Sequence, residues 1–176
     1  MKKICYEDKA HEQVDKARQL LADGLHKKAA QAFSNAAGLF VMVKDFASAV
    51  ACQNDAGNAY LDGGLVSNAA CAFSKAGELA FSSVDAQLWD TGSQSYEDAV
   101  QLEEGLMEYS LAAYHASNWA DALVKKKRYA DAVAAYGSAV AFLLLEGKHP
   151  LTARSDLEKM KAAERELQRE KTYDVD

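Results

Sequence analysis

Few side chains in this sequence have the types and spacing that catalysis or metal binding would need. Its four histidines have no cysteine or carboxylate at a metal-ligand spacing beyond chance. These histidines are His11, His26, His115 and His149. The adjacent acids Glu103 and Glu104 would point to different faces of a helix, so they do not converge on one site. No G-x-S-x-G, G-x-x-x-x-G-K-S/T or H-E-x-x-H motif occurs. The sequence therefore predicts a protein that is not an enzyme, with no catalytic, metal-binding or cofactor-binding residue and no cofactor.

The three cysteines, Cys5, Cys52 and Cys71, are an odd number without metal-ligand spacing. Cys52 and Cys71 lie among alanines, so we predict free, buried thiols that behave as small apolar side chains. Such thiols suit a reducing compartment. The N-terminal MKKICYEDK lacks the apolar core of a signal peptide, and no apolar run approaches the length of a membrane span. These features predict a cytoplasmic protein with no integral membrane segment.

The stretch DFASAVACQNDAGNAYLDGG, residues 45–64, could be either a glycine-rich ligand loop or a helix. No strand pattern precedes it and no lysine follows its glycines, so it is not a phosphate-binding loop. A helix that ends at Gly63 and Gly64 explains the composition better. Glycine inside a helix costs about 1 kcal/mol relative to alanine. Gly57 therefore predicts a close crossing with a neighbouring helix.

The pattern A-x-x-x-aromatic-x-x-A recurs along the chain, with Gln53 in place of the aromatic in its second copy. The alanines that open its first three copies, Ala29, Ala49 and Ala69, are spaced 20 residues apart, and a fourth copy opens at Ala132. Positions i, i+4 and i+7 share one helix face, so the alanines let a neighbouring helix approach while the central aromatic fills the gap. Twenty residues hold one helix and one turn, so a hairpin repeats about every 40 residues. Stacked antiparallel hairpins of this design form a solenoid, or right-handed superhelix.

The start and stop signals agree with one all-α helical-repeat domain over residues 1–176, containing about seven or eight helices. The predicted helices span roughly 7–23, 25–43, 46–61, 65–83, 95–124 with a break near Glu104 and Gly105, 129–146, and 150–170. Residues 89–95, WDTGSQS, are expected to be irregular, and Ser95 to Asp98 to form a capping box. The charged, amphipathic last helix suits either a closing cap or a partner helix.

Two segments resemble known families. Tyr129, Ala132, Tyr136 and Ala139 match the second half of the tetratricopeptide (TPR) consensus, without its closing proline. Residues 29–64 resemble the soluble NSF attachment proteins, or SNAP adaptors, whose D-A-G-N-A-(F/Y) motif is matched at every position by residues 55–60. The SNAP resemblance implies a stack of antiparallel helices that clamps SNARE coiled coils and recruits a hexameric AAA+ ATPase.

The net charge of −6 argues against general nucleic-acid binding. From Ala76 to Val124 there are nine acidic residues and no Lys or Arg, and a basic cluster follows at once. Such charges suit a solvated helix surface or, alternatively, a surface that faces a partner. SNAP adaptors meet acidic SNARE bundles with basic residues, a role that the acidic segment would oppose. The residues predicted to bind a partner are Lys27, Lys28, Lys44, Lys125, Lys126, Lys127, Arg128 and Trp89.

These observations predict a noncatalytic adaptor that binds a helical bundle, an amphipathic helix or an extended peptide through a concave face. SNARE and vesicle-trafficking machinery is the specific hypothesis, with peripheral membrane association through partners. One alternative is an MIT/TPR-type peptide-binding module over residues 109–170, which would hold an amphipathic helix of the partner. Another is a structural subunit whose alanine-rich faces serve self-assembly, and a further one is an accessory subunit of an enzyme.

Overall fold

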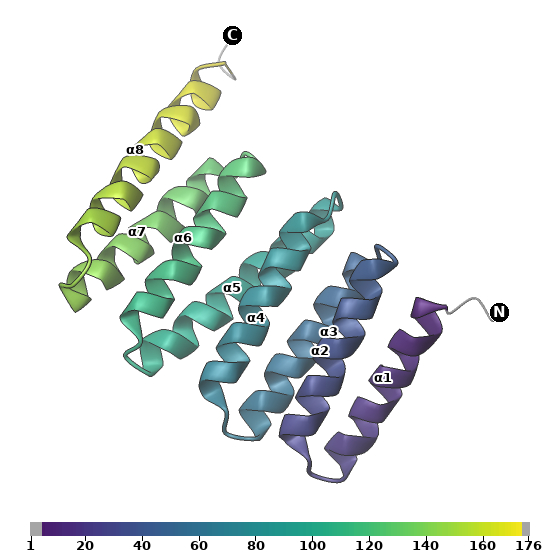
Figure 1. The fold of residues 1–176 in the computed structure, drawn as a ribbon. Helices are drawn as coiled ribbons and strands as arrows, with labels where there is room; N and C mark the ends of the chain where they lie inside the picture. Colours follow the sequence, from purple (N-terminus) through teal and green to yellow (C-terminus); the bar gives the residue numbers. More distant parts are fainter. Residues whose placement is uncertain (1–4, 174–176) are drawn as a thin grey trace. The chain divides into compact units, whose positions relative to one another are not determined.

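The computed structural model describes residues 5–173, and all regular structure within that range is α-helical. The helices are α1 (Tyr6–Ala22), α2 (His26–Met42), α3 (Phe46–Asp62), α4 (Val66–Ser82), α5 (Ala86–Gly105), α6 (Tyr109–Lys125), α7 (Tyr129–Glu146) and α8 (Pro150–Tyr173) (Figure 1). The chain divides into two compact units, one up to Leu102 and one from Glu103, so the boundary falls near the end of α5. The predicted all-α helical-repeat fold is confirmed. A single domain and a right-handed superhelix stay predictions.

The same turn follows α1, α2, α3, α5 and α6. After α1, the Gly24 N–H donates to the Leu21 carbonyl at 2.9 Å, and the Leu25 N–H donates to the Leu20 carbonyl at 2.8 Å. This is the Schellman pair of hydrogen bonds, which requires one residue in the left-handed conformation. The left-handed residues are Gly24, Lys44, Gly64, Met107, Lys127 and, after α7, Gly147, with φ between 59° and 71°. Their spacing of 20 residues within each unit confirms the repeat and extends it to α6 and α7.

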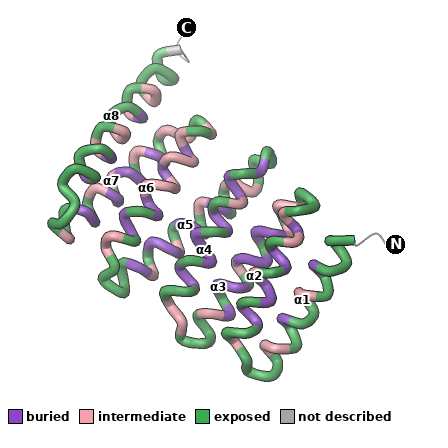
Figure 2. The backbone as a smooth tube through the Cα atoms, in the orientation of Figure 1, coloured by how far each residue is buried: buried purple, intermediate pink, exposed green. Residues whose placement is uncertain are grey.

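The left-handed residues give the helices a common register. The fifth residue after each of the first five is an alanine with no exposed surface, and these alanines are Ala29, Ala49, Ala69, Ala112 and Ala132. Figure 2 shows buried positions along the helix faces that meet their neighbours. Small side chains at these positions let the helices pack closely, as the repeat predicts.

Glycines mark the closest crossings in the first unit. A Cβ atom built on Gly57 of α3 would lie 2.6 Å from the Phe73 ring of α4. A Cβ on Gly77 of α4 would lie 2.4 Å from the Tyr96 ring of α5. Heavy atoms cannot approach so closely, so only glycine fits at these two positions without a shift. The predicted close crossing at Gly57 is confirmed.

The structure corrects the prediction for residues 89–95, which are helical. α5 begins at Ala86, and the break predicted near Gly105 separates α5 from α6. Ser95 lies buried in the middle of α5, with its hydroxyl 2.9 Å from the Thr91 carbonyl and 3.0 Å from Asn54 Oδ1 of α3, so it does not cap a helix. A Cβ on Gly92 would lie 2.6 Å from the Cβ of Ala80. The small polar residues that resembled a loop therefore serve close helix packing.

Two further expectations change. Cys71 is exposed, so the prediction of a buried thiol holds for Cys52 and is wrong for Cys71. Burial raises the pKa of the Cys52 thiol to about 11. Within residues 5–173, α7 is long and apolar enough to cross a membrane by length and composition, with a mean hydropathy of 1.3 over 18 residues. The statement that no apolar run approaches that length is therefore wrong, although core helices of soluble proteins pass the same test. The absence of an integral membrane segment stays a prediction.

Candidate functional site

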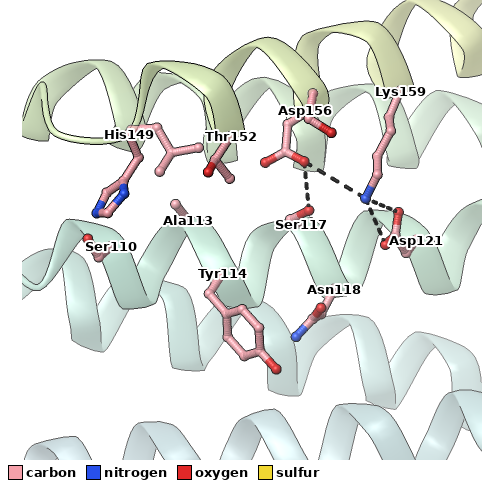
Figure 3. A pocket seen from close by; sticks show the side chains of 12 residues that line it. Ser110, Ala113, Tyr114, Ser117, Asn118, Asp121, His149, Thr152, Asp156 and Lys159 are labelled. Carbon is pink, nitrogen blue, oxygen red and sulfur yellow. Dashed lines mark hydrogen bonds and ion pairs between the residues drawn. The ribbon is translucent and has the colours of Figure 1, made fainter.

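A groove lies between α6 and α8 in the second unit. It has a volume of about 450 Å³. One wall comes from α6, and the other comes from α8 and the turn before it. Leu143 of α7 also lines the groove. Figure 3 shows Ser117 and Asp121 of α6 facing Asp156 and Lys159 of α8. Two helices that are not consecutive in the chain thus build the groove together.

The spacing of the polar residues explains why they line one groove. Ser110, Ser117 and Asp121 are seven and four residues apart on α6, so their side chains share one helix face. On α8, Thr152, Asp156 and Lys159 occupy the positions that hold the packing triad in other helices. The triad of α7, for example, is Ala132, Tyr136 and Ala139. α8 therefore keeps the register of the repeat and replaces its apolar stripe with a polar one.

Ion pairs and hydrogen bonds hold the walls of the groove in place. The Lys159 Nζ lies 3.0 and 3.1 Å from the two carboxylate oxygens of Asp121, and 3.9 Å from Asp156 Oδ1. Ser117 Oγ donates to Asp156 Oδ1 at 3.0 Å. The Tyr136 hydroxyl of α7 donates to Asp121, and the Lys159 Nζ lies 5.7 Å from the centre of the Tyr136 ring. These contacts fix α6, α7 and α8 to one another.

Burial changes the proton affinity of two groups in this network. Asp156 is only 3% exposed, and burial raises the pKa of its carboxyl above the ordinary value although Ser117 and Lys159 oppose the shift. Burial and the hydrogen bond to Asp121 raise the pKa of the Tyr136 hydroxyl. Both groups are already paired within the protein. Their arrangement suits a rigid recognition surface better than proton transfer to a substrate.

A second buried pair joins the end of α5 to α6 outside the groove. Glu103 near the end of α5 is 1% exposed, His115 is 7% exposed, and the His115 Nδ1 lies 2.9 Å from Glu103 Oε2. Sequence reasoning assigned neither residue a role. Glu103 lies four residues before the left-handed residue of its turn, and the same position before three other turns holds Leu20, Phe40 and Tyr60. A carboxylate at this position is therefore a departure from the repeat that the sequence already contains. Among residues 5–173, no three His, Cys, Asp or Glu side chains gather as a metal site.

Within the first unit, the three lysines predicted to bind a partner do not form one patch. Lys27 and Lys28 are exposed in the first turn of α2, and Lys44 is the exposed left-handed residue after that helix. Because α2 has 17 residues, its two ends lie about 25 Å apart. The three lysines therefore form two separate patches.

The other predicted residues lie in a turn and at the start of α5. Lys125 to Arg128 form the turn between α6 and α7, where Arg128 pairs with Asp131 at 2.7 Å. Trp89 is half-buried, and its Nε1 donates to the Ser83 carbonyl at 3.1 Å. None of the eight predicted residues lines the groove between α6 and α8. Their roles in binding stay predictions.

Comparison with known proteins gives a limited answer. No protein-family model and no curated protein sequence matches the chain. Two similar solved structures contain nearly identical TPR-like repeats assigned to a kinesin light chain of Podosopora anserina, one of them a point variant. The variant is 14% identical with a TM-score of 0.36, over 93% of this chain and 98% of that chain. The other structure is 14% identical with a TM-score of 0.36, over 96% of this chain and 100% of that chain.

At this identity and TM-score, the likeness carries no argument about a partner or an activity. The helices and turns of the protein themselves define its class, which is an all-α helical-repeat protein with TPR-like hairpins. The resemblance to the SNAP adaptors gains no support from these comparisons. It remains a hypothesis that rests on residues 29–64.

Proposed function

We propose that the protein is a noncatalytic protein-interaction module that holds an extended segment or one helix of a partner protein in the groove between α6 and α8. The observation that carries the proposal is a hollow of about 450 Å³ whose walls are already fixed by side-chain contacts. Because the side chains of the groove are already ordered, less conformational entropy is lost when a partner binds. The proposal agrees with the alternative of a peptide-binding module over residues 109–170, which covers α6 to α8.

The side chains of the groove suit a peptide. Tyr114 is 61% exposed and can stack on a partner side chain, while Ser110, Asn118 and Thr152 offer hydrogen-bonding groups for a peptide backbone. Asp121 and Asp156 contribute two carboxylates against the single ammonium of Lys159. This balance favours a segment that carries lysine or arginine over an acidic one.

A peptide-display selection on the full chain, followed by fluorescence anisotropy, tests this proposal. Asn118→Arg places a long cationic side chain in the groove without breaking the Ser117–Asp156 or Asp121–Lys159 contacts. We expect the selected peptides to be basic and to lose at least about tenfold in affinity for this variant, equivalent to about 1.4 kcal/mol.

Asn35→Arg is the matched control, because Asn35 of α2 has the same register as Asn118 and lines a shallower hollow between α1 and α2. The selected peptides should bind this control as they bind the unmodified chain. Peptides that tolerate Asn118→Arg but not Asn35→Arg would contradict the assignment of the site.

We also propose, as a second candidate, a SNAP-like adaptor role in cytoplasmic vesicle trafficking, supported by the exposure of Lys27, Lys28 and Lys44. In that role the protein would bind an assembled SNARE bundle and reach membranes only through its partners. Binding to such a bundle should weaken as salt rises. It should also weaken in a Lys27→Glu/Lys28→Glu variant, and Lys44→Glu tests the other end of α2 separately. Binding that persists at high salt and in all these variants excludes this role.

A further inference from the structure

The outward faces of the helices can be compared position by position, because the left-handed residues fix a common register. We define the outward stripe of a helix as the positions 7, 11, 14 and 18 residues after the preceding left-handed residue. All four positions are exposed in α2, α3, α4, α7 and α8. The stripe contains charged side chains in α3, α4 and α8, such as Asp55, Lys75 and Glu158. These helices present an ordinary solvated surface.

The outward stripe of α7 contains neither charged nor amide side chains, since it consists of Ala134, Ser138, Ala141 and Leu145, whereas the uncharged stripe of α2 contains Gln31 and Asn35. No charged residue occurs between Asp131 and Glu146. The one hydroxyl is already satisfied, because Ser138 Oγ donates to the Ala134 carbonyl at 3.3 Å. A helix that is apolar on all sides is normally covered on all sides.

Large apolar side chains extend this stripe at its carboxyl end. Leu144 and Leu145 are each 68% exposed, and Leu151 at the start of α8 is 81% exposed. The stripe together with Leu144 forms an exposed apolar surface along α7, and such a surface marks an interaction site. We infer that the outward stripe of α7 is the interface through which two copies of this chain pair, with their α7 helices antiparallel. This inference is independent of the proposed binding groove.

A protein helix fits the stripe better than a lipid surface does. Ala134, Ser138 and Ala141 are small, so the axis of a second helix can approach closely. A helix that lies in a lipid surface instead presents large apolar and aromatic side chains beside a basic face. In α7 the large exposed side chains are confined to one end.

A second copy is the partner that the charges favour. A two-fold interface uses the same patch twice, and an uncharged stripe brings no like charges together. Antiparallel pairing places Lys125 and Lys127, before one α7, near the end of the other α7. That end carries the negative pole of the helix dipole, while the Glu146 carboxylate there already pairs with Ser110 and Lys148.

Pairing through this stripe leaves the groove open. Leu143, which contributes to the groove, lies half a helical turn from Ala134 and Ala141 on the opposite side of α7. Dimer formation and partner binding can therefore be measured separately, and one can fail without the other.

Light scattering and sedimentation equilibrium of the full chain, from micromolar to millimolar concentration, test the inference. We expect a dimer. Leu145→Lys should raise its dissociation constant by at least about a hundredfold, because each copy would bury a charge beside Lys125 and Lys127 of the other copy. Met42→Lys is the matched control, since Met42 has the same register in α2 and is 59% exposed. It should leave the dimer intact, and circular dichroism checks that both variants remain helical.

Ser138→Cys supplies a second readout that does not depend on destabilising the interface. Ser138 lies near the middle of the stripe, so two copies that pair antiparallel bring this position together. In a Cys5→Ser/Cys71→Ser background, oxidation should cross-link the Ser138→Cys chains into dimers. A monomer at millimolar concentration, or a dimer that tolerates Leu145→Lys, overturns the inference. So does a monomer that binds phosphatidylcholine–phosphatidylserine vesicles through α7, because the stripe would then be a lipid-binding face.

Discussion

The two units of the protein use the same 20-residue repeat and the same turn, but they differ in what they do with the repeated positions. In the first unit the packing positions are filled by alanine, phenylalanine and one buried glutamine, Gln53, and the outward stripes of α3 and α4 carry charges. In the second unit α8 fills the packing positions with Thr152, Asp156 and Lys159, and α7 turns an uncharged stripe outward. The repeat therefore builds a scaffold, and we propose that departures from it mark where partners bind.

The largest expected effect comes from breaking the buried pair that is particular to the second unit. His115→Leu leaves Glu103 buried without its partner, which should lower the free energy of unfolding by about 3–5 kcal/mol. Denaturant unfolding followed by circular dichroism measures this loss.

The double variant Glu103→Leu/His115→Leu sharpens the same comparison. It restores the apolar character that Leu20 and Phe40 give to the equivalent position in the first unit. It should recover most of the lost stability. A double variant no more stable than His115→Leu would show that the pair is not the cause.

A glycine substitution tests the packing of the first unit. Gly57→Leu forces a side chain against the Phe73 ring and should cost about 3 kcal/mol. Gly38→Leu in α2 is the matched control, because a Cβ there meets nothing within 4 Å. The control should gain up to about 1 kcal/mol from helix propensity. Equal thermal stability of the two variants would contradict close packing at Gly57.

The pH dependence of stability tests the environment of Asp156. Because its pKa is raised in the folded state, the folded protein binds this proton more tightly than the unfolded chain does. The stabilisation that this carboxyl provides is fully present below its pKa in the unfolded chain. It is lost as the pH rises through its pKa in the folded protein. Relative to Asp156→Asn, the protein should therefore lose stability between pH 3 and neutral pH. A relative gain over that range would contradict the assignment.

The smallest effects concern the turns that both units share. Lys44 in the first unit and Lys127 in the second adopt the left-handed conformation that Gly24 and Gly64 adopt elsewhere. Lys44→Gly and Lys127→Gly should each raise the free energy of unfolding by up to about 1 kcal/mol, because glycine relieves the steric cost. Similar gains in both units would show that the turns are equivalent. A loss at either site would mean that the lysine side chain makes a compensating contact.

Sequence reasoning predicted the parts of the fold that depend on local spacing. The 20-residue period, the helical class and the close crossing at Gly57 follow from which positions share a helix face. The start of α5 was missed because Gly92 and Ser95 resemble loop residues, whereas tight packing against α3 and α4 is what selects them. Local composition cannot distinguish these two causes.

The candidate site was harder to predict, because it joins residues that lie far apart in the chain. Ser117 and Asp156 are hydrogen-bonded although they are 39 residues apart. The triad Thr152, Asp156 and Lys159 could have been found by extending the repeat from Gly147 into the last helix. The pattern of alanines and aromatics ends at Ala139, and the polar residues of the last helix do not match it. The site is visible as a departure from the pattern and not as a match to it.

Hydrogen–deuterium exchange of the full chain, with and without a peptide selected for binding, tests the central claim most directly. The account predicts that the peptide slows exchange in α6 and α8 and leaves α1 to α4 unchanged. Slowed exchange in α2, around Lys27 or Asn35, with α6 and α8 unaffected, would contradict the placement of the binding groove in the second unit.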